Sequence, residues 1–221
     1  MSVRAVVFDL YETLISEFAD GTRIAPSSGR GGQPLGIDDA TFNREWNARQ
    51  HGRMTGRWPD YPSVMRDILQ SLQLPVSEPM IQEMYETRIA DKSYPFRAIR
   101  PDIIALLREL RSRNLKLGLI SNCTEEEVRL WSECPLAEWF DCVFFSYETG
   151  VAKPDEAIYR MACDELCIPP QDAVFVGDGG SDELNGAARA GLHPLHAFWY
   201  NTYIASNYPK LHRPAQVLDF V

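Results

Sequence analysis

The pattern of apolar residues predicts alternating strands and helices over most of the chain. Short apolar runs occupy residues 3–8, 115–120, 142–145, 173–176 and 195–199. Nearly continuous runs of this length indicate strands covered on both faces of a parallel sheet. Apolar residues at helical spacing predict helices between them, at 101–114, 155–166 and 184–190. This alternation predicts an α/β fold with a doubly wound (Rossmann-like) parallel sheet.

Residues 16–97 interrupt this alternation. Residues 21–36 hold five Gly and two Pro, which predicts a mobile loop. Three helices follow, and we expect no strand between residues 16 and 94. The predicted helices begin after a cap at Asp38 or Asp39, at Tyr61-Pro62, and after a cap at Ser77. We therefore predict a discontinuous core of residues 1–15 and 98–221, with residues 16–97 as an inserted helical domain.

Charge and composition narrow the class of partner. The net charge of −9 argues against nucleic acid and anionic membranes, because both require clustered Lys and Arg. No apolar stretch is long enough to span a bilayer, and no signal peptide opens the chain. The five cysteines lack metal-site spacing, so we expect reduced thiols, no zinc and a cytoplasmic protein. A small anionic substrate is compatible with these features, since its site requires only local cations.

Polar residues follow four of the predicted strands. They are Asp9, Ser121, Lys153 and Asp178. Because ligands of open α/β sheets bind outside the carboxyl ends of the strands, we expect these residues to form one site. Asp9 can act as a nucleophile, giving an aspartyl phosphate by attack on phosphorus or an ester by attack on carbon. Lys153 can hold Asp9 ionised, and Ser121 can donate a hydrogen bond to substrate.

Further acids close to Asp9 suggest a metal. Asp178 and Asp182 lie four residues apart with glycines between them. Acids beside Asp9 would repel it unless a cation intervenes. Mg²⁺ is such a cation, because it binds carboxylates, waters and phosphate oxygens. The alternative is a glycine turn followed by acids at a helix N-terminus, where the helix dipole favours them.

The motifs together resemble those of the haloacid dehalogenase (HAD) superfamily of hydrolases. They read Asp9-Leu-Tyr-Glu-Thr13, Ser121-Asn122, Lys153-Pro154 and Gly177-Asp-Gly-Gly-Ser-Asp182, in the family's order. The insertion resembles the family's helical cap, which closes over the site and selects substrate. The resemblance implies Asp9 as nucleophile, with contacts to substrate and intermediate from Thr13, Ser121, Asn122 and Lys153.

The same resemblance implies a set of residues that bind Mg²⁺. In metal-dependent members Mg²⁺ would be held by Asp9, the backbone carbonyl of Tyr11 and Asp178. Asp182 would be a further metal ligand or a supporting acid, with Glu183 as a near substitute.

One position departs from the phosphatase pattern. Family phosphatases carry a second Asp two residues after the nucleophile, which protonates the leaving group and later activates water. Tyr11 stands there, and Glu12 replaces the usual glycine. A tyrosine at this place resembles the 2-haloacid dehalogenase branch, as does Tyr159. The fourth motif of that branch, however, resembles Ser-Ser-Asn, which this chain lacks. That branch also uses an arginine of the cap to receive halide, and neither Arg44 nor Arg49 aligns cleanly with that arginine.

Three functions stay open at this point. The first is a Mg²⁺-dependent phosphatase acting on a small phosphorylated metabolite, in which Tyr11 or water replaces the missing acid. The second is a carbon–halogen hydrolase, and the third is a weakly catalytic binding or regulatory protein on this scaffold. We favour the first, because buried acids without a metal are costly. We expect a monomer or homodimer.

Overall fold

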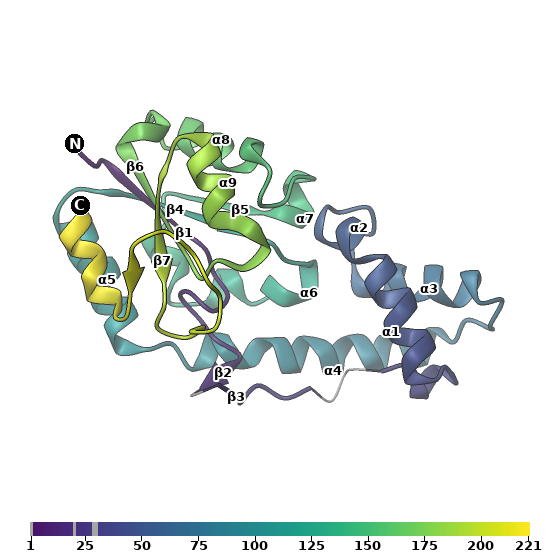
Figure 1. Cartoon of the computed structure of the whole chain (residues 1–221). Helices are drawn as coiled ribbons and strands as arrows, with labels where there is room; N and C mark the ends of the chain where they lie inside the picture. Colours follow the sequence, from purple (N-terminus) through teal and green to yellow (C-terminus); the bar gives the residue numbers. More distant parts are fainter. Residues whose placement is uncertain (1, 20, 28–30) are drawn as a thin grey trace.

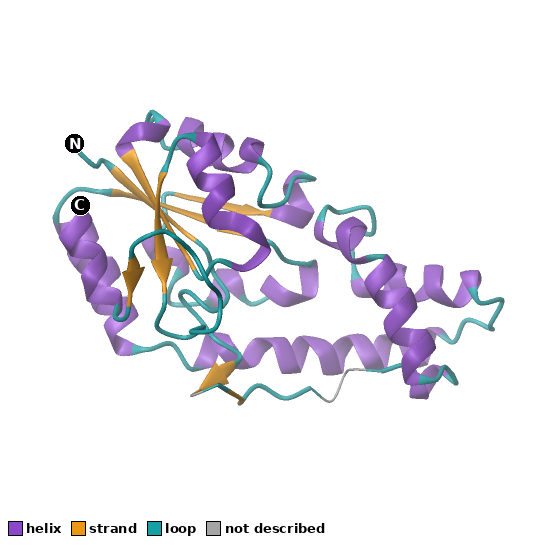
Figure 2. Cartoon of the chain, viewed as in Figure 1, coloured by secondary structure: helices purple, strands orange, loops and turns teal. Residues whose placement is uncertain are grey.

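A computed structural model describes residues 2–19, 21–27 and 31–221. Its centre is a six-stranded sheet in the order β5-β4-β1-β6-β7-β8, in which every neighbouring pair is parallel (Figures 1 and 2). The strands are β1 (Ala5–Phe8), β4 (Lys116–Ser121), β5 (Cys142–Phe145), β6 (Ala173–Gly177), β7 (His193–Ala197) and β8 (Lys210–Leu211). The predicted parallel α/β fold is confirmed, and β8 is an additional edge strand.

Strand β1 occupies the middle of the sheet and is buried on both faces. Its alternate side chains enter two different apolar cores: Val6 and Phe8 join one, and Ala5 and Val7 join the other. Because each face buries apolar side chains, the strand has no polar alternation, as its sequence predicted.

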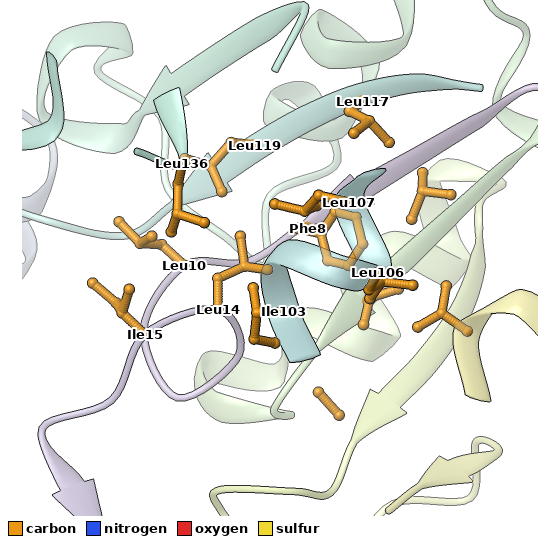
Figure 3. Packing of buried hydrophobic residues seen from close by; sticks show 14 of the residues in the cluster. Phe8, Leu10, Leu14, Ile15, Ile103, Leu106, Leu107, Leu117, Leu119 and Leu136 are labelled. Carbon is orange, nitrogen blue, oxygen red and sulfur yellow. The ribbon is translucent and has the colours of Figure 1, made fainter. Parts of the chain in front are cut away.

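Helices cover both faces of the sheet. Helix α5 (Pro101–Ser112) and the 3₁₀ segment Pro214–Phe220 pack on the Phe8 side, where Ile103, Leu106 and Leu107 of α5 belong to the same apolar core as Phe8 (Figure 3). Helices α8 (Glu156–Glu165) and α9 (Glu183–Ala190) pack on the opposite side. The short helices α6 (Glu125–Val128) and α7 (Ser146–Thr149) follow β4 and β5, next to the carboxyl edge of the sheet.

The inserted segment forms the three expected helices and one short helix, α2 (Gln50–Met54), that was not predicted. The expected helices are α1 (Asp39–Ala48), α3 (Tyr61–Ser71) and α4 (Glu78–Arg97). Asp38 caps α1 through the Thr41 amide, and Asp60 caps α3 through the Ser63 amide. These helices enclose a separate apolar core, and α4 runs along the side of the sheet domain out to α1 and α3 (Figure 1). The assignment of residues 16–97 to a separate cap domain stays a prediction.

The expectation of no strand between residues 16 and 94 is wrong. Strand β2 (Phe18–Ala19) pairs antiparallel with β3 (Thr22–Arg23). The carboxylate of Glu12 accepts the Glu17 amide, which fixes the entry to this small hairpin through a contact that apolar periodicity does not reveal.

The glycine-rich stretch 21–36 also contains regular structure, since it includes β3 and a 3₁₀ turn at Gln33–Leu35. The rest of the predicted loop includes residues 28–30, which lie outside the described residues. None of the helices in the described ranges is both long and apolar enough to cross a bilayer.

Candidate active site

Lys153 lies between two buried carboxylates at the carboxyl edge of the sheet. Its Nζ donates to Oδ1 of Asp9 and lies 2.5 Å from Oε2 of Glu183. The other carboxylate oxygen of Asp9 accepts a hydrogen bond from Thr13 Oγ1 at 3.0 Å. Of the four residues expected to form one site, Asp9 and Lys153 are therefore in direct contact, and Thr13 is bonded to Asp9 as well.

The loop that carries Lys153 is held by Asn122. The Asn122 amide donates to the Lys153 carbonyl and accepts from the Lys153 amide, both at 2.8 Å. Ser121, at the end of β4, is almost fully buried. Asn122, expected to contact substrate, thus uses its side chain to position Lys153.

Asp178 is oriented by two donors. Its Oδ1 accepts the Gly180 amide and its Oδ2 accepts Nδ2 of Asn201, both at 2.8 Å. One carboxylate oxygen each from Asp9, Asp178 and Glu183 lie within 4.8 Å of one another.

Asp182 does not lie in this cluster. Its carboxylate is exposed, accepts from Asn185 and lies 3.5 Å from Arg189. Ser181 and Asp182 both have positive φ, 53° and 56°, so the backbone turns Asp182 outward before α9 begins at Glu183. The acid predicted at Asp182 is thus supplied by its neighbour Glu183.

The buried cluster carries more negative than positive charge. Burial raises the pKa of Asp9, and Asp178 adds to this although Lys153 opposes it. Burial and Asp9 likewise raise the pKa of Glu183 well above its usual range. Burial alone would lower the pKa of Lys153, but Asp9 and Glu183 raise it, so the ammonium form persists. Three carboxylates around one ammonium are a donor set that fits a hard divalent cation.

The comparison with known families identifies the family of the chain. The family model described as haloacid dehalogenase-like hydrolase matches residues 3–191. The chain belongs to the haloacid dehalogenase-like hydrolases. The six-stranded parallel sheet flanked by helices is thus the fold of a HAD hydrolase.

Two curated relatives of this HAD hydrolase are named as phosphatases. The phosphoserine phosphatase of Thermus thermophilus is 31% identical over 129 residues, which is 58% of this chain and 49% of the relative. The glyceraldehyde 3-phosphate phosphatase of Methanopyrus kandleri is 32% identical over 105 residues, which is 46% of this chain and 44% of the relative. The chain thus spans about half the length of the curated relatives it matches.

Solved structures named as a dehalogenase and as a phosphatase share this fold. A 2-haloacid dehalogenase from Pseudomonas syringae has a TM-score of 0.72 at 21% identity, covering 98% of this chain and 97% of that one. A HAD phosphatase from Thermococcus onnurineus has a TM-score of 0.64 at 20% identity, covering 100% of this chain and 97% of that one. At these identities the likeness shows the fold alone.

The Tyr11 side chain of this HAD hydrolase is directed toward α6. Its hydroxyl donates to the Glu127 backbone carbonyl at 2.7 Å, and its ring packs edge-on against Phe96. Burial and the nearby Glu127 raise the pKa of Tyr11 well above 10. Its proton is thus both bonded elsewhere and difficult to release, which argues against Tyr11 as the replacement acid.

The other residues that suggested a dehalogenase have structural partners. The Tyr159 hydroxyl donates to the Glu183 carbonyl at 2.7 Å and so supports the start of α9. Arg49 bonds Glu45 and Asp67 within the helical insertion, and Arg44 is largely exposed beside Glu45. None of these contacts places an arginine at Asp9.

Two functional neighbours were not predicted. Trp199 Nε1 donates to the Thr13 carbonyl at 2.8 Å, and Asn201 holds Asp178. The Oδ1 of Asn201 is buried without a hydrogen-bond partner in the described part of the chain. Trp199 stands at the end of the predicted strand 195–199, whereas β7 ends at Ala197. Asn201 lies in the aperiodic stretch that follows, where its place after a strand end was the available signal.

Proposed function

We propose that this HAD hydrolase is a Mg²⁺-dependent phosphatase of small phosphorylated metabolites. The observation that carries the proposal is the cluster of buried carboxylates at Asp9, Asp178 and Glu183, in which Lys153 is the one cation that the ion pairs of the described residues provide. A dehalogenating aspartate needs no such cluster, whereas a phosphate ester and its metal ion do. Asp9, Asp178 and Glu183 would hold the ion, together with the Tyr11 carbonyl.

The reaction would proceed in two displacements. An oxygen of Asp9 attacks phosphorus, the bond from phosphorus to the leaving oxygen breaks, and an aspartyl phosphate forms. Water then attacks that phosphorus and releases phosphate and free Asp9. Lys153 keeps Asp9 ionised and neutralises phosphate charge, while Ser121 donates to a phosphate oxygen. Bound Mg²⁺ would supply further neutralisation of the phosphate oxygens.

The leaving alcohol must take its proton from water in this scheme. The Tyr11 hydroxyl donates away from the site, and no acid stands at the position that family phosphatases use. A positioned general acid typically contributes about 10²–10⁴-fold. Turnover of alkyl phosphates should therefore be slow, and good leaving groups should be strongly preferred.

The relatives support the reaction class. Besides the phosphatases above, a pyrimidine 5'-nucleotidase of Escherichia coli is 33% identical over 106 residues. A HAD family enzyme from Bacteroides thetaiotaomicron with this fold was solved as a magnesium complex. The three curated relatives are named for different phosphate esters, so they support the reaction class and do not indicate one metabolite.

Hydrolysis of p-nitrophenyl phosphate tests the proposal. The wild-type protein is assayed with Mg²⁺ and with EDTA, beside Asp9→Asn and the exposed-site control Asp182→Asn. We expect activity that requires both Asp9 and Mg²⁺ and that survives Asp182→Asn. Full activity in Asp9→Asn, or activity indifferent to EDTA, would contradict the mechanism.

A carbon–halogen hydrolase is the second candidate, and the geometry of Tyr11 favours it. A departing halide needs no proton, so a site without an acid at this position suffices. Attack of Asp9 on carbon would expel halide and leave an ester for water to hydrolyse. Chloride release from L-2-chloropropionate in EDTA, absent in Asp9→Asn, would replace the phosphatase proposal.

A further inference from the structure

A cavity of about 350 Å³ lies between the helical insertion and α6. Its volume is within the range of small-molecule sites. Aromatic rings and cations line much of it: Phe42, Trp46, Tyr61, Arg53, Arg88 and Lys92. This combination suits a ligand that is partly apolar and negatively charged.

Two of the three cations are neutralised by acids of the protein. Arg88 Nε lies 2.6 Å from Glu126, and Lys92 Nζ lies 2.8 Å from Glu127 and 3.0 Å from Glu17. These pairs join α4 to α6 and to the hairpin entry. Their charges are committed to the protein and leave little for a ligand.

Arg53 differs from both. Its side chain is buried, with the residue only 5% exposed, and its guanidinium carbon lies 3.7 Å from the centre of the Trp46 ring. Among the described residues its Nε has no hydrogen-bond partner, and the ion pairs at this cavity do not include it. Burial lowers the pKa of Arg53 to about 10.

A buried guanidinium of this kind is costly unless an anion satisfies it. Stacking on Trp46 covers one face of the group, and Nε, on the edge that binds carboxylate and phosphate, has no partner among the described residues. The Tyr61 hydroxyl, also lining the cavity, is a second buried group without a partner in the described chain. Two unsatisfied groups in one cavity indicate a ligand.

The cavity reaches the active-site loop through two of its lining residues. Tyr11 donates to the Glu127 carbonyl, and Lys92 Nζ lies 5.5 Å from the Tyr11 ring centre. Tyr11 is two residues from Asp9. The loop that carries the nucleophile therefore contacts the wall of this cavity, and a substrate with phosphorus at Asp9 would have to extend past Tyr11 to reach Arg53.

We propose that Arg53 binds a second anionic group of the substrate, a carboxylate at the end remote from the scissile phosphate. This inference rests on the proposed phosphatase function and adds the substrate class, a phosphorylated carboxylic acid. A second phosphate offers the same chemistry, so the experiment separates the two.

Three matched series of esters test this. Straight-chain ω-phosphonooxy carboxylic acids of three to six carbons are compared with alkyl phosphates and α,ω-bisphosphates of equal length, each with Mg²⁺. At one chain length, we expect KM for the phosphonooxy carboxylic acid to be about 10- to 100-fold below KM for the alkyl phosphate. A charge-assisted hydrogen bond from Arg53 to the carboxylate would account for a difference of this size. A preference for the bisphosphate instead would overturn the carboxylate assignment.

Variants locate the effect. Arg53→Gln should remove the KM preference, and Tyr61→Phe should reduce it several-fold, which keeps the test valid if Arg53→Gln does not fold. Arg57→Gln is the matched control, because Arg57 also stacks on a tryptophan, Trp58, but is exposed and does not line the cavity. Arg57→Gln should preserve the preference.

The outcomes separate the two proposals. Turnover of all esters without a preference at any length overturns the role of Arg53 and keeps the phosphatase. If no ester turns over, the phosphatase proposal fails and the same esters are titrated by calorimetry. Equal binding by wild type and Arg53→Gln in that titration would also overturn the role of Arg53.

Discussion

Oε2 of Glu183 lies 2.5 Å from Nζ of Lys153, with both side chains at most 3% exposed. The preceding acid, Asp182, has a side chain that is 53% exposed. A buried member of the candidate metal site and a surface acid are therefore consecutive in the sequence, and the two can be tested as a pair.

Glu183→Gln should impair metal binding and Asp182→Asn should not. Loss of a group that ligates or orients at a metal site typically costs about 10- to 100-fold in affinity or activity, whereas a surface substitution changes little. The measurement is kcat/KM for p-nitrophenyl phosphate against Mg²⁺ concentration for both variants. Equal effects in the two would contradict the placement of the metal at Glu183.

The same variant should not destabilise the metal-free protein. Burial and Asp9 raise the pKa of Glu183, which means that its charge is unfavourable where it lies. Glu183→Gln leaves Lys153 paired with Asp9 alone, so Tm in EDTA should be unchanged or higher, while the rise in Tm on adding Mg²⁺ should shrink. Thermal scans with and without Mg²⁺ measure both, and a lower Tm in EDTA would contradict this charge balance.

Tyr11→Phe should change stability more than chemistry. The hydroxyl donates to the Glu127 carbonyl and has no contact with Asp9, so kcat should stay within about threefold while the free energy of unfolding falls by about 1 kcal/mol. Urea unfolding and steady-state kinetics measure the two effects. A large fall in kcat with an unchanged unfolding free energy would restore Tyr11 as the proton donor.

The sequence was sufficient to predict the sheet and part of the site. Parallel strands bring their carboxyl ends to one edge, so the apolar runs already implied that Asp9 and Lys153 would meet. Their ion pair follows from this arrangement. The expected helices of the insertion also appear, because caps such as Asp38 are local signals.

The remaining site depended on features without a local signal. Glu183 replaces Asp182 because two consecutive non-glycine residues adopt positive φ, a conformation that such residues rarely take. The direction of the Tyr11 hydroxyl depends on α6, 116 residues away in sequence. Asn201 lies in an aperiodic stretch, and its contact with Asp178 arises only once β7 has placed it.

Activity should depend steeply on the leaving group. Without an acid at position 11, negative charge develops fully on the departing oxygen, so kcat/KM should fall strongly as the pKa of the leaving alcohol rises. A series of substituted phenyl phosphates measures the slope. Tyr11→Asp, which places the family's acid at this position, is the informative comparison, and a shallow slope in the wild type would indicate an unrecognised proton donor.

Acidic pH should weaken the ion pairs between α6 and α4, which are intact at neutral pH. Glu127 lies 2.8 Å from Lys92 and 3.5 Å from Arg88. Although burial opposes ionisation, these two cations lower the pKa of Glu127 to about 2, from 4.5. Because the folded-state pKa is below the unfolded one, the stabilisation is fully present above about pH 5 and is lost as the pH falls toward 2.

The difference between wild type and Glu127→Gln isolates this contribution. Glutamine keeps an oxygen that can accept the Thr124 amide, as Glu127 does, but carries no charge. The wild type should be more stable by about 3 kcal/mol at pH 7, and the difference should shrink steadily between pH 4.5 and pH 2. Urea unfolding across this range measures it, with the exposed Glu133→Gln as a control that should track the wild type. A difference independent of pH would mean that Glu127 stabilises α6 through packing and not through its charge.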